Sequence, residues 1–125
     1  MRPVADHTRA HAALLNAVLI ALGAHPKLRL WRQNSGLFEI VGTDRKVRAI
    51  PEGSPDIAGV LSGGRLVGWE IKTGTGRPNP AQVVRLTVLR EFGALAGVVR
   101  SVEQAVSAVD AALRGEWKPG PGLEL

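Results

Sequence analysis

Apolar and polar residues alternate with a period of two through the middle of the chain. In the run 66–72 ("LVGWEIK"), Val67, Trp69 and Ile71 alternate with Gly68, Glu70 and Lys72, which predicts a strand with one side chain in two on each face. The run 57–61 ("IAGVL") is predicted to be the strand before it. The intervening Ser-Gly-Gly at 62–64 predicts a tight hairpin turn between them. The run 95–99 ("LAGVV") is wholly apolar or glycine, as is typical of a strand covered on both faces.

Extended structure is also expected upstream of this hairpin. Residues 28–41 alternate but are interrupted near residues 34–36 by the turn-forming "QNSG", so we predict a break there. "GTDR" predicts a turn and "KVRAI", at 46–50, a short strand. Trp31 and Trp69 both alternate with polar neighbours, so both are expected to point into the core.

The first helix is expected to begin near Asp6 or Thr8, either of which can cap it, and to end at Gly23. Its broad apolar surface predicts burial on most sides. His11 and Asn16 interrupt the apolar run, which is also shorter than the roughly 20 residues that a membrane span needs. A membrane partner is therefore not expected.

Two more helices follow the strands. Asn79 as cap and Pro80 at the first helical position open the clearer one. Ser101 and Gln104 have capping-box spacing ahead of the last helix, which Gly115 closes. The order helix, about three strands, helix, strand, helix predicts a single α/β domain over residues 1–115. The Pro- and Gly-rich tail, 116–125, is expected to lack regular structure apart from Trp117, which can dock on the body.

Composition narrows the range of functions. The 125 residues support one core, and 16 Lys and Arg against 11 Asp and Glu give a net charge of +5 and a pI of about 10.7, which suits an anionic partner such as nucleic acid. The chain has no cysteine, which excludes disulfides, thiolate catalysis and cysteine-ligated metals and favours a cytoplasmic location. Any metal must bind oxygen or histidine.

Two acidic residues lie on the predicted hairpin. Asp56 opens its first strand and Glu70 lies on the second, so their side chains can converge. Converging carboxylates repel each other, and a hard divalent cation such as Mg²⁺ is a common way to offset that repulsion. The backbone carbonyl of Ile71 can supply a third oxygen.

Lys72 is expected on the same face as Glu70, one strand repeat further on. Beside a metal, this ammonium can orient a water molecule or stabilise developing charge, which would complete a set for phosphodiester hydrolysis. The alternative is a turn aspartate plus a surface ion pair between Glu70 and Lys72, which would contribute little.

Longer motifs carry a resemblance to a known family. "SPD" at 54–56 followed by "EIK" at 70–72 resembles the P-D...(D/E)-x-K signature of the restriction-endonuclease-like nucleases. Together with "WRQNSG" (31–36), "GSPDIAGV" (53–60), "GWEIKTGTGRPNPAQ" (68–82) and "GVVRSVEQAV" (97–106), it resembles the VRR-NUC domain, especially its stand-alone phage or prophage version, over roughly residues 7–114.

The resemblance implies an α-β-β-β-α-β core, here followed by an extra C-terminal helix. It also implies divalent-metal nuclease activity in the cytoplasm of a bacterial host, and a homodimer that acts on branched DNA such as four-way junctions. Asp56 and Glu70 match the family's metal-binding carboxylates, Lys72 its catalytic lysine, and Gln82 a glutamine near the site. The family commonly places a glutamate early in the first helix. Here His7 or His11 stands near that place. Because imidazole suits Mn²⁺ better than Mg²⁺, Mn²⁺ is an alternative metal.

Several polar residues are candidate DNA contacts, each with a plainer alternative. Those in "WRQNSG" can reach the cut strand or merely stabilise a turn. Those of the predicted hairpin can bind phosphate or form a solvated face. The "TGTGRPN" loop can bind phosphate or be an ordinary flexible loop. They are Arg32, Asn34, Arg45, Lys46, Arg48, Thr73 and Arg77. The sequence thus supports a metal-dependent DNA endonuclease, with a non-catalytic nucleic-acid-binding module that keeps the same fold as the alternative and RNA as a possible substrate.

Overall fold

The computed structural model describes residues 5–33, 37–48, 50–118 and 123–125, except for the side chains of residues 5–8, 37 and 38. Its elements, in chain order, are α1 (Ala5–Leu22), β1 (Leu28–Arg32), β2 (Leu37–Glu39), β3 (Lys46–Arg48), β4 (Ile57–Leu61), β5 (Leu66–Ile71), α2 (Pro80–Glu91), β6 (Leu95–Val99) and α3 (Val102–Leu113).

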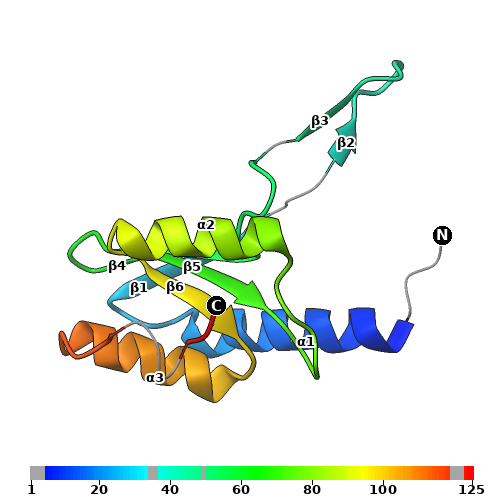
Figure 1. Ribbon diagram of the computed structural model, residues 1–125. Coiled ribbons are helices and arrows are strands. Elements are labelled where there is room, and N and C mark those ends of the chain that lie inside the picture. Colours follow the sequence, from blue (N-terminus) through cyan, green and yellow to red (C-terminus); the bar gives the residue numbers. More distant parts are fainter. Residues whose placement is uncertain (1–4, 34–36, 49, 119–122) are drawn as a thin grey trace.

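The main sheet has four strands in the order β1-β4-β5-β6. β1, β4 and β5 are antiparallel neighbours, and β6 runs parallel to β5 after the α2 crossover. In Figure 1, α2 covers one face of the sheet, while α1 and α3 cover the other. The fold is therefore α/β, as predicted, and without β2 and β3 its order is the expected α-β-β-β-α-β core with a further helix.

β2 and β3 form a separate antiparallel hairpin. Figure 1 shows it extending away from the sheet and helices. The turn at residues 41–44 and the strand Lys46–Arg48 agree with the sequence prediction. Residues 34–36, where the break was expected, lie outside the described part of the chain.

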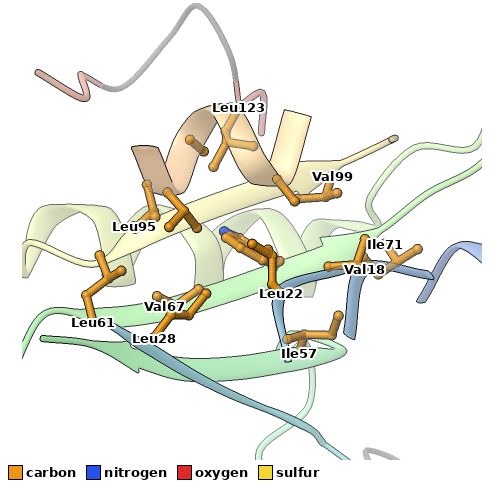
Figure 2. Packing of buried hydrophobic residues seen from close by; sticks show 14 of the residues in the cluster. Val18, Leu22, Leu28, Ile57, Leu61, Val67, Ile71, Leu95, Val99 and Leu123 are labelled. Carbon is orange, nitrogen blue, oxygen red and sulfur yellow. The ribbon is translucent and has the colours of Figure 1, made fainter. Parts of the chain in front are cut away.

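The larger part of the core lies between the sheet and the α1–α3 layer. Figure 2 shows Val18 and Leu22 of α1 facing Ile57, Val67, Ile71, Leu95 and Val99 of the sheet. A smaller apolar group between the sheet and α2 consists of Leu86, Ala94, Ala96 and Val98, with Leu89 packed against it. The uniformly buried β6 contributes to both sides, as its apolar run predicted.

The predicted caps and turns are confirmed for the later elements, but α1 already includes Ala5, so neither Asp6 nor Thr8 is its cap residue. Asn79 and Gln82 form a complete capping box at the start of α2. Ser101 caps α3, but the side chain of Gln104 accepts from the backbone N–H of Arg100 at 2.6 Å instead of closing the box on Ser101. The hairpin turn at residues 62–64 is closed by a hydrogen bond from the N–H of Leu61 to the carbonyl of Arg65.

Two predictions of burial and one of irregular structure were wrong. Trp69 is fully buried on a central strand, but Trp31 lies on the edge strand β1 and is 47 % exposed. α1 packs by one face only, and Ile20 on its other side is 81 % exposed. The C-terminal tail is not wholly irregular, because Leu123 is fully buried in the core and Glu124 pairs with Val98 of β6.

No helix in the described part of the chain is both long enough and apolar enough to cross a membrane.

Candidate functional site

The carboxyl groups of Asp56 and Glu70 meet where β4 begins and β5 ends. The antiparallel register pairs Ile57 with Trp69, so Asp56 and Glu70 are the next residues along the two strands. Trp69 and Ile71 point into the core and are fully buried. Alternation then places Glu70 on the opposite face, beneath α2.

Local structure ahead of β4 holds Asp56 in place. The backbone N–H and the hydroxyl of Ser54 both donate to the carbonyl of Pro51, at 3.2 and 2.6 Å. Gly53 has a φ of +80°, and a Cβ there would lie 2.4 Å from the carbonyl oxygen of Ala81. Only glycine accepts both the left-handed conformation and this contact with the start of α2. The "GSPD" turn is thereby packed directly against that helix.

Asp56 contacts several separate segments of the chain. Its Oδ2 accepts from the backbone N–H of Ile71 at 2.9 Å, which ties the end of β5 to the carboxylate. The same oxygen lies 3.2 Å from Nε2 of His11, on α1. Gln33 supports it from the end of β1, since its N–H donates to the Asp56 carbonyl and its side-chain amide to the Pro55 carbonyl. The backbone and side chain of Asp56 are therefore held by contacts from three different parts of the fold.

Glu70 lies deeper than Asp56. It is only 2 % exposed, and its Oε1 accepts from the Gln82 side chain at 2.9 Å and lies 3.8 Å from the Lys72 ammonium. Its buried Oε2 has no hydrogen-bond partner among the described residues. An orphaned carboxyl oxygen of this kind is costly unless a proton or a cation neutralises it. The alternative of a surface ion pair does not hold, because Glu70 is buried on a central strand.

The capping box fixes how Gln82 meets Glu70. Oε1 of Gln82 accepts from the backbone N–H of Asn79 at 2.9 Å, and a backbone N–H can only donate. The amide nitrogen of Gln82 must therefore face Glu70. One side chain caps α2 and also orients the buried carboxyl group.

Burial raises the pKa of Glu70 from 4.5 to about 9. The neighbouring Asp56 adds to the rise, through its charge and through a hydrogen bond between the two acids, while Lys72 opposes it. Because Oε2 has no partner of good hydrogen-bond geometry, we regard the contact between the acids as loose and burial as the principal cause. In the metal-free protein at neutral pH, Glu70 therefore carries a proton.

The site has the chemistry of a hard-cation site without being a preformed one. Among the side chains that the structure describes, those of residues 9–33, 39–48, 50–118 and 123–125, no group of three or more His, Asp or Glu is arranged to hold a metal. The donors nearby are two carboxyl groups, one with an orphaned oxygen, and the His11 imidazole bonded to Asp56. This oxygen-rich set fits Mg²⁺ or Mn²⁺ if the cation displaces the proton of Glu70.

The structure brings most of the predicted catalytic residues together. Glu70 contacts Lys72 and Gln82, and Asp56 accepts from the N–H of Ile71, the residue next to Glu70 whose carbonyl was the predicted ligand. Of the two candidate histidines, His11 reaches Asp56, whereas the side chain of His7 is outside the described part of the structure. Gln33 was not predicted, although it stands beside Arg32 in the same "WRQNSG" motif.

The candidate DNA contacts in the described part of the chain lie on separate elements. Arg45, Lys46 and Arg48 are exposed on the β2–β3 hairpin, but Glu39 is the register partner of Lys46. Arg48 also lies 4.0 Å from Glu52. These acids reduce the positive charge of the hairpin, so a solvated face remains an alternative for it.

The other candidate contacts lie at strand ends. Arg32 is exposed at the end of β1, and Asn34 lies outside the described residues. Thr73 and the exposed Arg77 belong to the loop that follows Lys72, where the N–H of Gly76 donates to the Thr73 carbonyl at 3.0 Å. This loop is the candidate contact region closest in sequence to the carboxyl pair.

Comparison with models of known protein families and with curated proteins gave no match.

Proposed function

We propose that this protein is a divalent-metal-dependent endonuclease that hydrolyses phosphodiester bonds in DNA. The observation that carries the proposal is the buried Glu70 with its orphaned oxygen, next to Asp56 and 3.8 Å from the Lys72 ammonium. Two acids and a lysine held this close, under a helix that orients one of them, are unusual for a purely structural site, and perturbed pKa values are frequent at functional sites.

Asp56, Glu70 and the Ile71 carbonyl, with His11 beside Asp56, are the groups that would hold Mg²⁺ or Mn²⁺. When bound, the cation would polarise the phosphate and lower the pKa of a water molecule. Gln82 keeps Oε1 of Glu70 in a fixed direction, so that the free Oε2 remains available. Lys72, half-buried beside Glu70, is placed to stabilise negative charge or to orient the attacking water.

The resemblance to VRR-NUC nucleases supports the same activity and suggests branched DNA as the substrate. A domain of this size covers few base pairs, so symmetric cutting of a four-way junction requires a homodimer with a two-fold axis. Light scattering is expected to show a dimer at micromolar concentration. A monomer would limit the enzyme to nicking. The lack of cysteine is consistent with a cytoplasmic protein.

The decisive experiment incubates the purified protein with supercoiled plasmid and with single-stranded, duplex, flap and four-way junction DNA, each with Mg²⁺, Mn²⁺ or EDTA. We expect metal-dependent nicking that Lys72→Ala reduces by about 10²-fold or more. Lys27→Ala removes an exposed lysine elsewhere and is the matched control. Intact substrates with both metals, or equal cleavage by Lys72→Ala and Lys27→Ala, would refute the proposal.

The second candidate is a nucleic-acid-binding module without catalysis. It is favoured by the absence of a preformed group of three metal ligands in the described residues and by the proton that burial keeps on Glu70. It predicts metal-independent DNA binding with a steep salt dependence and no cleavage on any substrate. An RNA panel run in parallel tests the remaining choice of nucleic acid.

A further inference from the structure

The last described residues, 123–125, lie on the free edge of the sheet. Glu124 forms an isolated antiparallel bridge with Val98 of the edge strand β6, and the Val98 N–H donates to the Glu124 carbonyl at 2.7 Å. Leu123 is fully buried in the main core, and Figure 2 shows it beside Leu95 and Val99. The segment is thus held by backbone pairing and by an apolar anchor.

Arg90 and Gly97 strengthen this attachment. Nε of Arg90 donates to the Ala96 carbonyl at 2.6 Å, and Nη2 of the same side chain donates to the carbonyl of Leu123. A Cβ on Gly97 would lie 2.8 Å from Cβ of Leu123 and 2.9 Å from the Glu124 carbonyl oxygen, so glycine permits the close approach. None of these contacts uses the side chain of Glu124.

The side chain of Glu124, which takes no part in that attachment, forms an ion pair with Nε of Arg100, the residue that follows β6. Nη1 of the same guanidinium donates to the Gly74 carbonyl at 3.3 Å. Gly74, Thr75, Arg77, Arg100 and Glu124 line a hollow of about 280 Å³. Two arginines therefore share this hollow with one carboxylate, which comes from a segment distant in sequence.

The hollow adjoins the candidate catalytic site. The Lys72 N–H donates to the Val99 carbonyl at 3.2 Å, so the ends of β5 and β6 that carry Lys72 and Arg100 are side by side. A nucleic-acid backbone that reached Lys72 would have its next phosphates close to the loop at 73–77.

We propose that this hollow is a second phosphate-binding site, formed by Arg100 and Arg77, and that Glu124 occupies it as an internal competitor of the nucleic-acid backbone. That the bound phosphate belongs to DNA rests on the proposed function, whereas the anion site itself does not. The side chain of Glu124 is 51 % exposed, and half-exposed ion pairs contribute little to stability. A phosphodiester, which can accept two hydrogen bonds from one guanidinium, is therefore able to displace it.

The test measures binding of fluorescein-labelled duplex DNA by anisotropy in EDTA, where no cleavage occurs, over a range of NaCl concentrations. Glu124→Gln removes the competing charge and keeps the backbone contacts of the segment. Glu116→Gln is the matched control, because it removes the same charge from an exposed ion pair with Arg114, outside the hollow. We expect Glu124→Gln to bind about threefold or more tightly than Glu116→Gln, with a salt slope steeper by about 0.9, which corresponds to one more phosphate contact. Adding Arg100→Gln should abolish the gain.

A measurement without DNA separates this inference from the proposed function. Titration with inorganic phosphate, followed through the NMR signal of the Arg100 Nε–H, should saturate at lower concentration in Glu124→Gln than in Glu116→Gln. If no variant binds DNA but this difference is present, the nuclease proposal fails and the anion site stands. Equal DNA affinities together with equal phosphate titrations for the two variants would overturn the inference and leave the nuclease proposal intact.

Discussion

The buried carboxyl group of Glu70 should make the stability of the metal-free protein fall as the pH rises. Its pKa is about 9 in the folded protein against 4.5 as the ordinary value. Between these two values the folded state holds a proton that the unfolded state has lost. The contribution of Glu70 to stability is therefore complete below about pH 4.5 and is lost progressively up to about pH 9.

The magnitude follows from one proton per molecule. Each pH unit within this window changes the free energy of unfolding by about 1.4 kcal/mol, so the loss from pH 5.5 to 7.5 is about 2.7 kcal/mol. Glu70→Gln is nearly isosteric, can still accept from the Gln82 amide, and has no carboxyl group to ionise. It should lack this loss and be the more stable variant at pH 7.5.

Urea denaturation in EDTA at several pH values, followed by tryptophan fluorescence, to which the buried Trp69 contributes, measures both proteins. The difference between their free energies of unfolding isolates Glu70 from all other titrating groups. Asp56→Asn should lower the pH at which this loss of stability is complete, because it removes the neighbouring charge that raises the pKa of Glu70. Parallel pH profiles for the wild type and Glu70→Gln would show that Glu70 titrates as an ordinary carboxyl group, and would refute the reasoning.

Metal addition provides the complementary measurement. A divalent cation bound at the site must displace the Glu70 proton, so binding should release protons and be tighter at pH 8 than at pH 5.5. Mn²⁺ should therefore raise the midpoint of thermal unfolding of the wild type more at the higher pH. The same Mn²⁺ concentration should leave Glu70→Gln almost unchanged. An equal shift in both proteins would place the metal elsewhere.

Three further predictions concern individual side chains. Trp69→Ala should destabilise the protein by about 3–5 kcal/mol in urea denaturation. Trp31→Ala, at a 47 % exposed edge position, should change stability by less than about 1 kcal/mol. Similar losses for the two variants would contradict the difference in burial between the two tryptophans. Leu123→Ala should cost about 2–4 kcal/mol because it empties a buried site, and a neutral result would mean that the C-terminal segment is not docked in solution. Gln82→Ala should lower stability by about 1 kcal/mol through its cap and also slow DNA cleavage by about 10-fold, while Gln104→Ala, which loses a comparable contact at α3, should affect stability only.

Much of the fold could be read from local signals. The caps at Asn79 and Ser101 and the Ser-Gly-Gly hairpin turn depend on a few consecutive residues, whose conformational preferences are the same in any fold. The hairpin register followed from the short turn, and with it the convergence of Asp56 and Glu70. For this reason the carboxyl pair and Lys72 could be predicted from the sequence alone.

Contacts between distant segments could not be predicted in this way. Alternation shows that Trp31 and Trp69 each face away from polar neighbours, but not that β1 is an edge strand and β5 a central one. The same pattern placed Glu70 on a polar face without showing that α2 would bury it. The Pro- and Gly-rich composition of the tail concealed the docking of Leu123, which depends on Gly97 and Arg90, more than 20 residues upstream.

The sequence by itself determined the strands of the main sheet, the limits of the second and third helices, the turns and the carboxyl–lysine motif, because these depend on neighbours along the chain. Only the tertiary structure decided which faces are covered. That covering supplied the pKa of Glu70 of about 9, the contact of His11 with Asp56 from another layer, and the ion pair of Glu124 with Arg100. Burial and electrostatic contacts depend on groups close in space, and the packing of distant segments places those groups.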